Sequence, residues 1–144
     1  MLRRCLLVLL LTTFPAAADG GLTRGAAAQT PAPAEGSLSA VRVREERNGR
    51  APLADVYLHI RGRKVRVWRN AAGELSPIAR ADYDDHKVPA GAVAAGTLWW
   101  AGQGKDFYVT LRRNQLYVYA RDVDEGGGDS RYRRLPRAIP LPRR

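Results

Sequence analysis

The side chains best suited to binding are aromatic rings and guanidinium groups that alternate with aliphatic residues along several segments. Flat rings offer stacking area and guanidinium groups offer charge, which together suit sugars, nucleobases or acidic protein loops. The alternative is structural, because tyrosine and arginine are common on the outer face of strands, and that face can also form a second core layer. We predict a ligand-binding set of eight residues: Tyr57, Arg66, Trp68, Tyr108, Arg112, Tyr117, Tyr119 and Arg121.

A cluster of acidic residues with a histidine is the first candidate for metal or acid–base chemistry. Closely spaced carboxylates suit calcium, and a carboxylate beside an imidazole suits proton transfer. The segment lacks the glycine turn and the distal glutamate of a calcium loop, so we expect a solvated loop there. The cluster consists of Asp82, Asp84, Asp85 and His86.

A second acidic segment surrounds the glycines at residues 126–128. Asp122 and Asp124 have the spacing with which calcium loops begin, but Glu125 and Asp129 do not continue that pattern. A loose hairpin connection is the expected structure. We therefore predict no metal site in either acidic segment.

Nucleophilic catalysis has little support in the sequence. The chain has two histidines, His59 and His86, and its four serines do not lie in a glycine-elbow context. No glycine-rich phosphate loop precedes a helix. The sequence thus predicts no catalytic residue and no cofactor, and it favours a protein that is not an enzyme.

The charge of the chain favours an anionic partner. The formal net charge is +10, and only three of the 24 basic residues are lysines, so nearly all the positive charge is guanidinium. Guanidinium groups bind carboxylate or phosphate in bidentate fashion. Residues 131–144 carry six arginines and form either an anion-seeking arm, for example toward a membrane surface, or a frayed terminus. Surplus charge for solubility is the alternative explanation.

The first 18 residues have the order of a cleavable secretory signal. Arg3 and Arg4 form a charged start, residues 5–14 are apolar, and residues 15–18 end in small side chains. The apolar run is about half of the roughly twenty residues that a membrane span requires. We therefore predict cleavage after Ala18 and export to the periplasm or the medium.

Three further parts follow the signal. Residues 19–37 are rich in Ala, Gly and Pro and predict a flexible tether. Residues 38–139 form a single domain, and residues 140–144 form a basic tail. Cleavage would remove Arg3, Arg4 and Cys5, which lowers the formal charge from +10 to +8 and leaves a chain without cysteine. Its stability must then come from burial rather than from disulfides.

Inside the domain, apolar and polar residues alternate with period two, which is typical of strands with one face toward a core. Five segments show this pattern clearly: residues 41–44, 55–60, 64–68, 106–112 and 115–121. Residues 96–100 and 131–135 are weaker candidates, and Asn48-Gly49, residues 61–63, residues 70–73 and Arg113-Asn114 carry turn chemistry. The predicted fold is mainly β, a small antiparallel meander of six to eight strands that forms a barrel or a sandwich.

Three functions remain open from the sequence. The first is a noncatalytic binding module, an inhibitor or ligand-capturing protein of the cell envelope, whose partner is an anionic macromolecule, a polysaccharide or an acidic protein; nucleic acid is not excluded. The second is a structural or assembly subunit in which the same face is buried against another subunit. The third is a small hydrolase or metal enzyme that uses the acidic cluster around His86.

Overall fold

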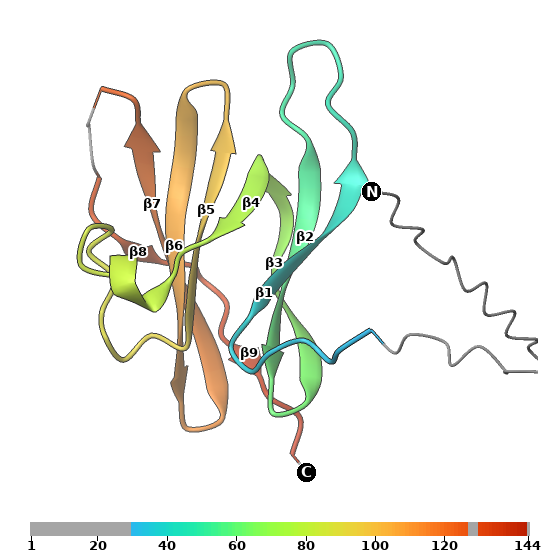
Figure 1. Cartoon of the computed structure of the whole chain (residues 1–144), viewed down its shortest axis with the longest axis vertical. Coiled ribbons are helices and arrows are strands. Elements are labelled where there is room, and N and C mark those ends of the chain that lie inside the picture. The colour runs from blue at the N-terminus through green and yellow to red at the C-terminus, as the bar shows by residue number, and fades with distance from the viewer. Residues whose placement is uncertain (1–29, 127–129, 144) are drawn as a thin grey trace, which may run out of the picture. The chain divides into compact units, whose positions relative to one another are not determined.

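The computed structural model describes residues 30–126 and 130–143 (Figure 1). The predicted signal at residues 1–18 and most of the predicted tether lie outside the described residues. The described residues are 56% strand and contain no α-helix, so the prediction of a mainly β fold is confirmed. None of its helical turns is long and apolar enough to cross a membrane.

The first sheet has three antiparallel strands in the order β1-β2-β3 (Figure 1). They span Leu38–Arg44, Leu53–Ile60 and Arg63–Ala72. The turn between β2 and β3 consists of Arg61 and Gly62, whose φ angles of 52° and 68° are those that a two-residue type I′ hairpin requires. We call this sheet the small sheet.

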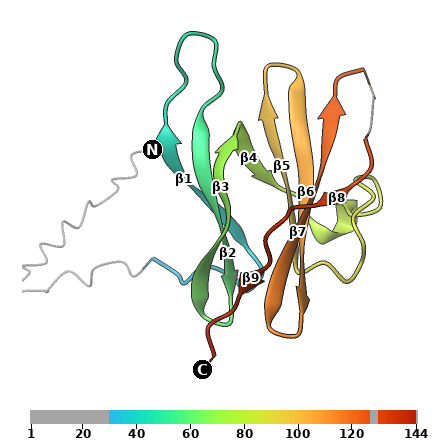
Figure 2. The same cartoon turned by 180° about the vertical axis from the view of Figure 1, so that it is seen from behind.

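The second sheet has six antiparallel strands and is called the large sheet. Its strands are β4 Glu74–Pro77, β5 Ala94–Trp100, β6 Gln103–Arg112, β7 Gln115–Asp124, β8 Arg133–Arg134 and β9 Ile139–Pro140. Both β8 and β9 pair with β7, so the segment near the C-terminus follows that strand (Figure 2). The predicted turn at Arg113-Asn114 is confirmed, with φ angles of 46° and 64°.

One apolar core takes its side chains from both sheets. Its most buried large residues are Leu58 of β2, Leu98 of β5, Phe107 of β6 and Leu116 of β7. Leu58, Phe107 and Leu116 occupy predicted inward positions of the alternating segments, so burial of apolar surface explains both these strands and their register. The core defines a core face and an outer face for each sheet.

The chain changes sheets between β3 and β4 at Gly73. The φ angle of Gly73 is 109°, and a Cβ at this position would lie 3.0 Å from the backbone nitrogen of Trp99. A glycine is required because the backbone conformation is left-handed and the neighbouring strand approaches closely. The sequence prediction of a turn at residues 70–73 is therefore wrong in extent, because β3 continues to Ala72.

A loop between β4 and β5 folds over the outer face of the large sheet. It contains the single 3-10 turn η1, Arg80–Asp82, within the described residues (Figure 1). Tyr83 and Val88 of this loop pack with Tyr108 in a second, smaller apolar cluster. One part of the outer face is consequently a buried layer.

Folded contacts also extend past the predicted domain limits at residues 38 and 139. Gly36 donates a backbone hydrogen bond to the carbonyl oxygen of His59 at 2.7 Å. Leu141 is buried in the core, and its backbone hydrogen-bonds with Asn114. Part of the predicted tether and part of the predicted tail thus belong to the folded domain.

Candidate functional site

The structure does not bring the eight predicted binding residues to one surface. Five of them lie on the outer face of the large sheet: Tyr108, Arg112, Tyr117, Tyr119 and Arg121. Two, Tyr57 and Arg66, pair with each other on the outer face of the small sheet, and Trp68 lies on the core side. Their role in binding stays a prediction, but the single exposed face from which it was inferred does not exist.

Trp68 faces the core because β3 contains β-bulges. The register with β2 shifts between Tyr57–Arg66 and Val56–Trp68, so Val67 and Trp68 together oppose one residue of β2. An extra residue in a strand breaks the period-two pattern that placed Trp68 outside. The Trp68 ring instead packs edge-on against Phe107, with ring centroids 5.5 Å apart.

Three tyrosines form a partly covered cluster on the outer face of the large sheet. Tyr108 and Tyr119 stack with ring centroids 4.9 Å apart, and Tyr132 packs against Tyr108 at 4.8 Å. Tyr108 is buried, and burial raises its pKa. These rings therefore pack against one another, which agrees with the structural alternative, a second core layer.

Next to the tyrosines, the buried carboxylate of Asp106 collects three hydrogen bonds. Thr97 donates at 2.7 Å, Arg121 donates at 3.0 Å, and Nδ1 of His86 lies 3.0 Å away. Burial alone would raise the pKa of Asp106, but these three hydrogen bonds together outweigh burial and hold the pKa below its usual value. The Asp106–Arg121 pair is buried and mutually neutralised.

Tyr132 closes this network from the C-terminal segment. Its hydroxyl donates a hydrogen bond of 2.8 Å to the backbone carbonyl oxygen of His86, and its ring lies 5.0 Å from the Arg121 guanidinium. Burial raises the pKa of Tyr132 to about 12. The network thus fastens the β4–β5 loop to the sheet. Within the described residues, the hydroxyl groups that take part in it are those of Thr97 and Tyr132.

On the small sheet, Asp55 holds the second bulge of β3. Its carboxylate accepts a hydrogen bond from the backbone N–H of Asn70 at 2.9 Å and one from Arg66 at 3.1 Å. The bond from Asn70 lowers the pKa of Asp55 more than burial raises it, and Arg66 lowers it further. Asn70 has a φ angle of 51°, so the carboxylate stabilises a left-handed residue inside a strand.

The acidic cluster of the β4–β5 loop is divided between solvent and sheet. Asp82, Asp84 and Asp85 are exposed, whereas the ring of His86 turns toward Asp106. Within residues 30–126 and 130–143, no three His, Cys, Asp or Glu side chains come close enough to hold a metal ion. The second acidic segment is described only up to residue 126 and from residue 130.

A groove runs between β3 and the segment that links β8 to β9. Its volume is about 450 Å³, and we call it the basic groove. Arg66, Arg69 and Arg137 line its rim, and Trp68 lies between the first two. The remaining lining residues are apolar: Val67, Val118, Leu135, Pro136 and Ile139.

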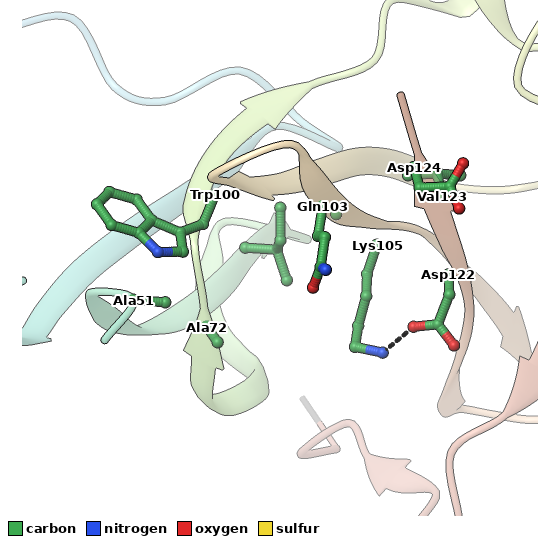
Figure 3. A pocket seen from close by; sticks show the side chains of 10 residues that line it. Ala51, Ala72, Trp100, Gln103, Lys105, Asp122, Val123 and Asp124 are labelled. Atoms are coloured by element: carbon green, nitrogen blue, oxygen red, sulfur yellow. Dashed lines mark hydrogen bonds and ion pairs between the residues drawn. The ribbon is translucent and has the colours of Figure 1, made fainter. Parts of the chain in front are cut away.

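A cavity of about 340 Å³ opens at the turn between β5 and β6 (Figure 3). Trp100 and Leu98 supply its apolar surface, while Lys105 and Asp122 form an ion pair across neighbouring strands. Trp99 lies on the opposite face, where its ring covers Gly104. The cavity has mixed charge, in contrast to the basic groove.

One signal in the sequence could have identified the Asp106–Arg121 pair. The two-residue turn at Arg113-Asn114 fixes the hairpin register, which places Asp106 opposite Arg121 and Tyr108 opposite Tyr119. The partners from distant segments, His86 and Tyr132, leave no such local signal. Comparison with known protein families, characterised proteins and solved structures finds no match to this chain.

Proposed function

We propose that this chain is an exported, noncatalytic binding module that holds an anionic partner in the basic groove. The observation that carries this proposal is the composition of the groove. Three of its nine lining residues are arginines and none is acidic. Guanidinium groups above an apolar floor favour a ligand that carries negative charge on a partly apolar frame.

The contrast with the Asp106 network supports the choice of site. Arg121 is buried against Asp106 and has no surface to offer a ligand. Arg69 and Arg137 are exposed at the groove. Of the eight residues predicted from sequence, Arg66 and Trp68 line the groove. The proposed site therefore still combines aromatic and arginine side chains, but it lies in the groove and not on the predicted outer face.

Two finer features belong to the same proposal. The shared core of the two sheets supports a sandwich rather than a closed barrel, since the sheets are separate in their hydrogen bonding. The secretory pattern of residues 1–18 supports work in the periplasm or outside the cell.

The proposal is tested with the purified chain and two polyanions, dextran sulfate and polyglutamate, at low and high salt. We expect salt-weakened binding, because exposed charges are screened. Arg69→Ala with Arg137→Ala should weaken binding about 100-fold, since each lost charge-assisted contact costs about 1.5 kcal/mol or more. Binding that the double variant leaves unchanged would exclude the groove.

The control is Arg112→Ala, which removes one positive charge from the outer face of the large sheet and is compared with Arg69→Ala alone. We expect this variant to bind like the unmodified chain. A loss of affinity in Arg112→Ala alone would return the binding site to the outer face that the sequence predicted.

A second candidate function is assembly into an envelope complex. It is favoured by Val41 and Val43 of the outer strand β1, which are 45% and 54% exposed. A stable oligomer that persists at high salt and dissociates in Val41→Thr with Val43→Thr would support it, and a monomer at every concentration would exclude it. The charge of the groove makes ligand capture the better supported function.

A further inference from the structure

The basic groove follows the free edge of a strand. β3 is the last strand of the small sheet and pairs only with β2. The groove is lined by four consecutive β3 residues, from Arg66 to Arg69. These residues include side chains of both faces, so the groove lies along the edge of the strand rather than on one face. An edge strand presents backbone N–H and C=O groups that can pair with another chain, and a segment that pairs here has to follow the bulges of β3.

The opposite wall of the groove offers apolar surface to such a chain. Leu135 and Ile139 are half-buried, and they pack against the common core from the segment between β8 and β9. A strand added to β3 would place alternate side chains over these residues. Its remaining side chains would point the same way as Arg66, toward the outer face.

We propose that the groove receives an extended acidic segment of a partner protein, which pairs with β3 as a fourth strand. This inference rests on the proposed function and names the class of the anionic partner. Alternating residues give the segment its pattern: acidic side chains on one face pair with the arginines, and apolar side chains on the other face contact Trp68 and Leu135. Main-chain hydrogen bonds add affinity, and the charges select the partner.

Other anionic macromolecules fit the groove less well. Binding of single-stranded nucleic acid relies on exposed rings as stacking platforms, but Trp68 is half-buried and packed edge-on against Phe107. A membrane surface requires a protruding basic face, whereas these arginines border a concave groove. The segment therefore has to be narrow, extended and acidic.

The other outer strand shows why β3 is the edge to which the segment binds. On β1, Arg42 is already paired with Glu45 at 2.8 Å and with Glu74 at 3.3 Å. The charge at that edge is thus largely offset. At the β3 edge, Arg66 is paired with Asp55 at 3.1 Å, but Arg69 and Arg137 are exposed and the lining contains no acidic residue, which favours acidic over neutral or basic segments.

The test uses a labelled peptide of alternating glutamate and valine with the full chain, followed by fluorescence anisotropy. Two further peptides carry N-methyl groups on alternate residues, one on the odd positions and one on the even positions. Methylation removes N–H donors from one edge of the added strand and leaves the charge unchanged. We expect one methylated peptide to lose at least tenfold in affinity, and the other to bind within about twofold of the parent.

The variants separate pairing from charge. Arg69→Ala with Arg137→Ala should weaken the parent peptide about 100-fold, while Arg112→Ala should leave it unchanged. If both methylated peptides bind like the parent while the double variant still weakens binding, strand pairing is wrong and the proposed function stands. The same holds if dextran sulfate binds through Arg69 and Arg137 but the peptide does not. If neither probe responds to the double variant, both proposals fail.

Discussion

The outer face of the large sheet and the basic groove contain the same kinds of side chain but differ in what those side chains contact. On the outer face, Arg121 is buried against Asp106, and Tyr108 is stacked on Tyr119. At the groove, Arg69 and Arg137 are exposed beside apolar residues. An arginine that is already neutralised holds the fold together, whereas an exposed one is available to a partner. Residue type alone does not separate the two cases.

The largest effect that would sharpen this contrast is expected from Asp106→Ala. The substitution leaves the buried guanidinium of Arg121 without its carboxylate, which costs about 3–5 kcal/mol in comparable pairs. Urea unfolding at neutral pH measures the loss. Asp122→Ala is the matched control, because this exposed carboxylate pairs with Lys105 at the surface. Equal losses in the two variants would contradict the structural role of Asp106.

The acid limb of the stability curve should depend on the same carboxylate. Because the folded pKa of Asp106 is lowered, its contribution is present above the unfolded pKa of about 3.9 and is lost as pH falls through the folded value. We expect the unmodified chain to lose stability below about pH 4, and Asp106→Asn to show a flatter dependence there. Thermal unfolding between pH 2 and pH 6 measures both, and parallel curves would contradict the expectation.

Asp55→Ala should have the next largest effect. It removes the acceptor for the Asn70 N–H and for Arg66, so both the bulge and the position of one groove arginine are lost. We expect a loss of stability between those of Asp106→Ala and Tyr132→Phe, together with weaker polyglutamate binding. Unfolding and binding measured on the same samples test this. Unchanged binding would show that the bulge does not shape the groove.

Tyr132→Phe should cost about 1 kcal/mol, the typical net value of one hydrogen bond. The hydroxyl donates to the carbonyl oxygen of His86 and fastens the β4–β5 loop. Since the folded pKa of Tyr132 is raised to about 12, its contribution is complete below about pH 10 and is lost as pH rises toward 12. Thermal unfolding at pH 8 and pH 11 measures this: the melting temperature of the variant should change less between the two pH values than that of the unmodified chain.

The smallest effect on stability is expected from Arg69→Ala with Arg137→Ala. Both side chains are exposed, so the free energy of unfolding should change by less than about 0.5 kcal/mol per site. Urea unfolding of this double variant and of the unmodified chain measures the change. A loss comparable with that of Asp106→Ala would mean that the groove arginines are structural and would remove the contrast.

The sequence predicts the strands whose alternation is unbroken. β2, β6 and β7 follow it because one face of each is buried, and the turns at Arg61-Gly62 and Arg113-Asn114 fix their register. β3 departs from the pattern because its bulges depend on Asp55, a residue of another strand. The basic groove could not be predicted because it joins β3 to residues about seventy positions farther along the chain, a contact that no local pattern records.

The position of Leu141 has a consequence for the order of folding. This side chain fills part of the core, and Asn114 holds its backbone in place at the turn between β6 and β7. During synthesis the hairpin of β6 and β7 can form early from neighbouring residues, but the core stays incompletely packed until Leu141 has left the ribosome. Formation of the β6–β7 hairpin and completion of the core are therefore separate steps in folding, and the second waits for the segment that follows β7.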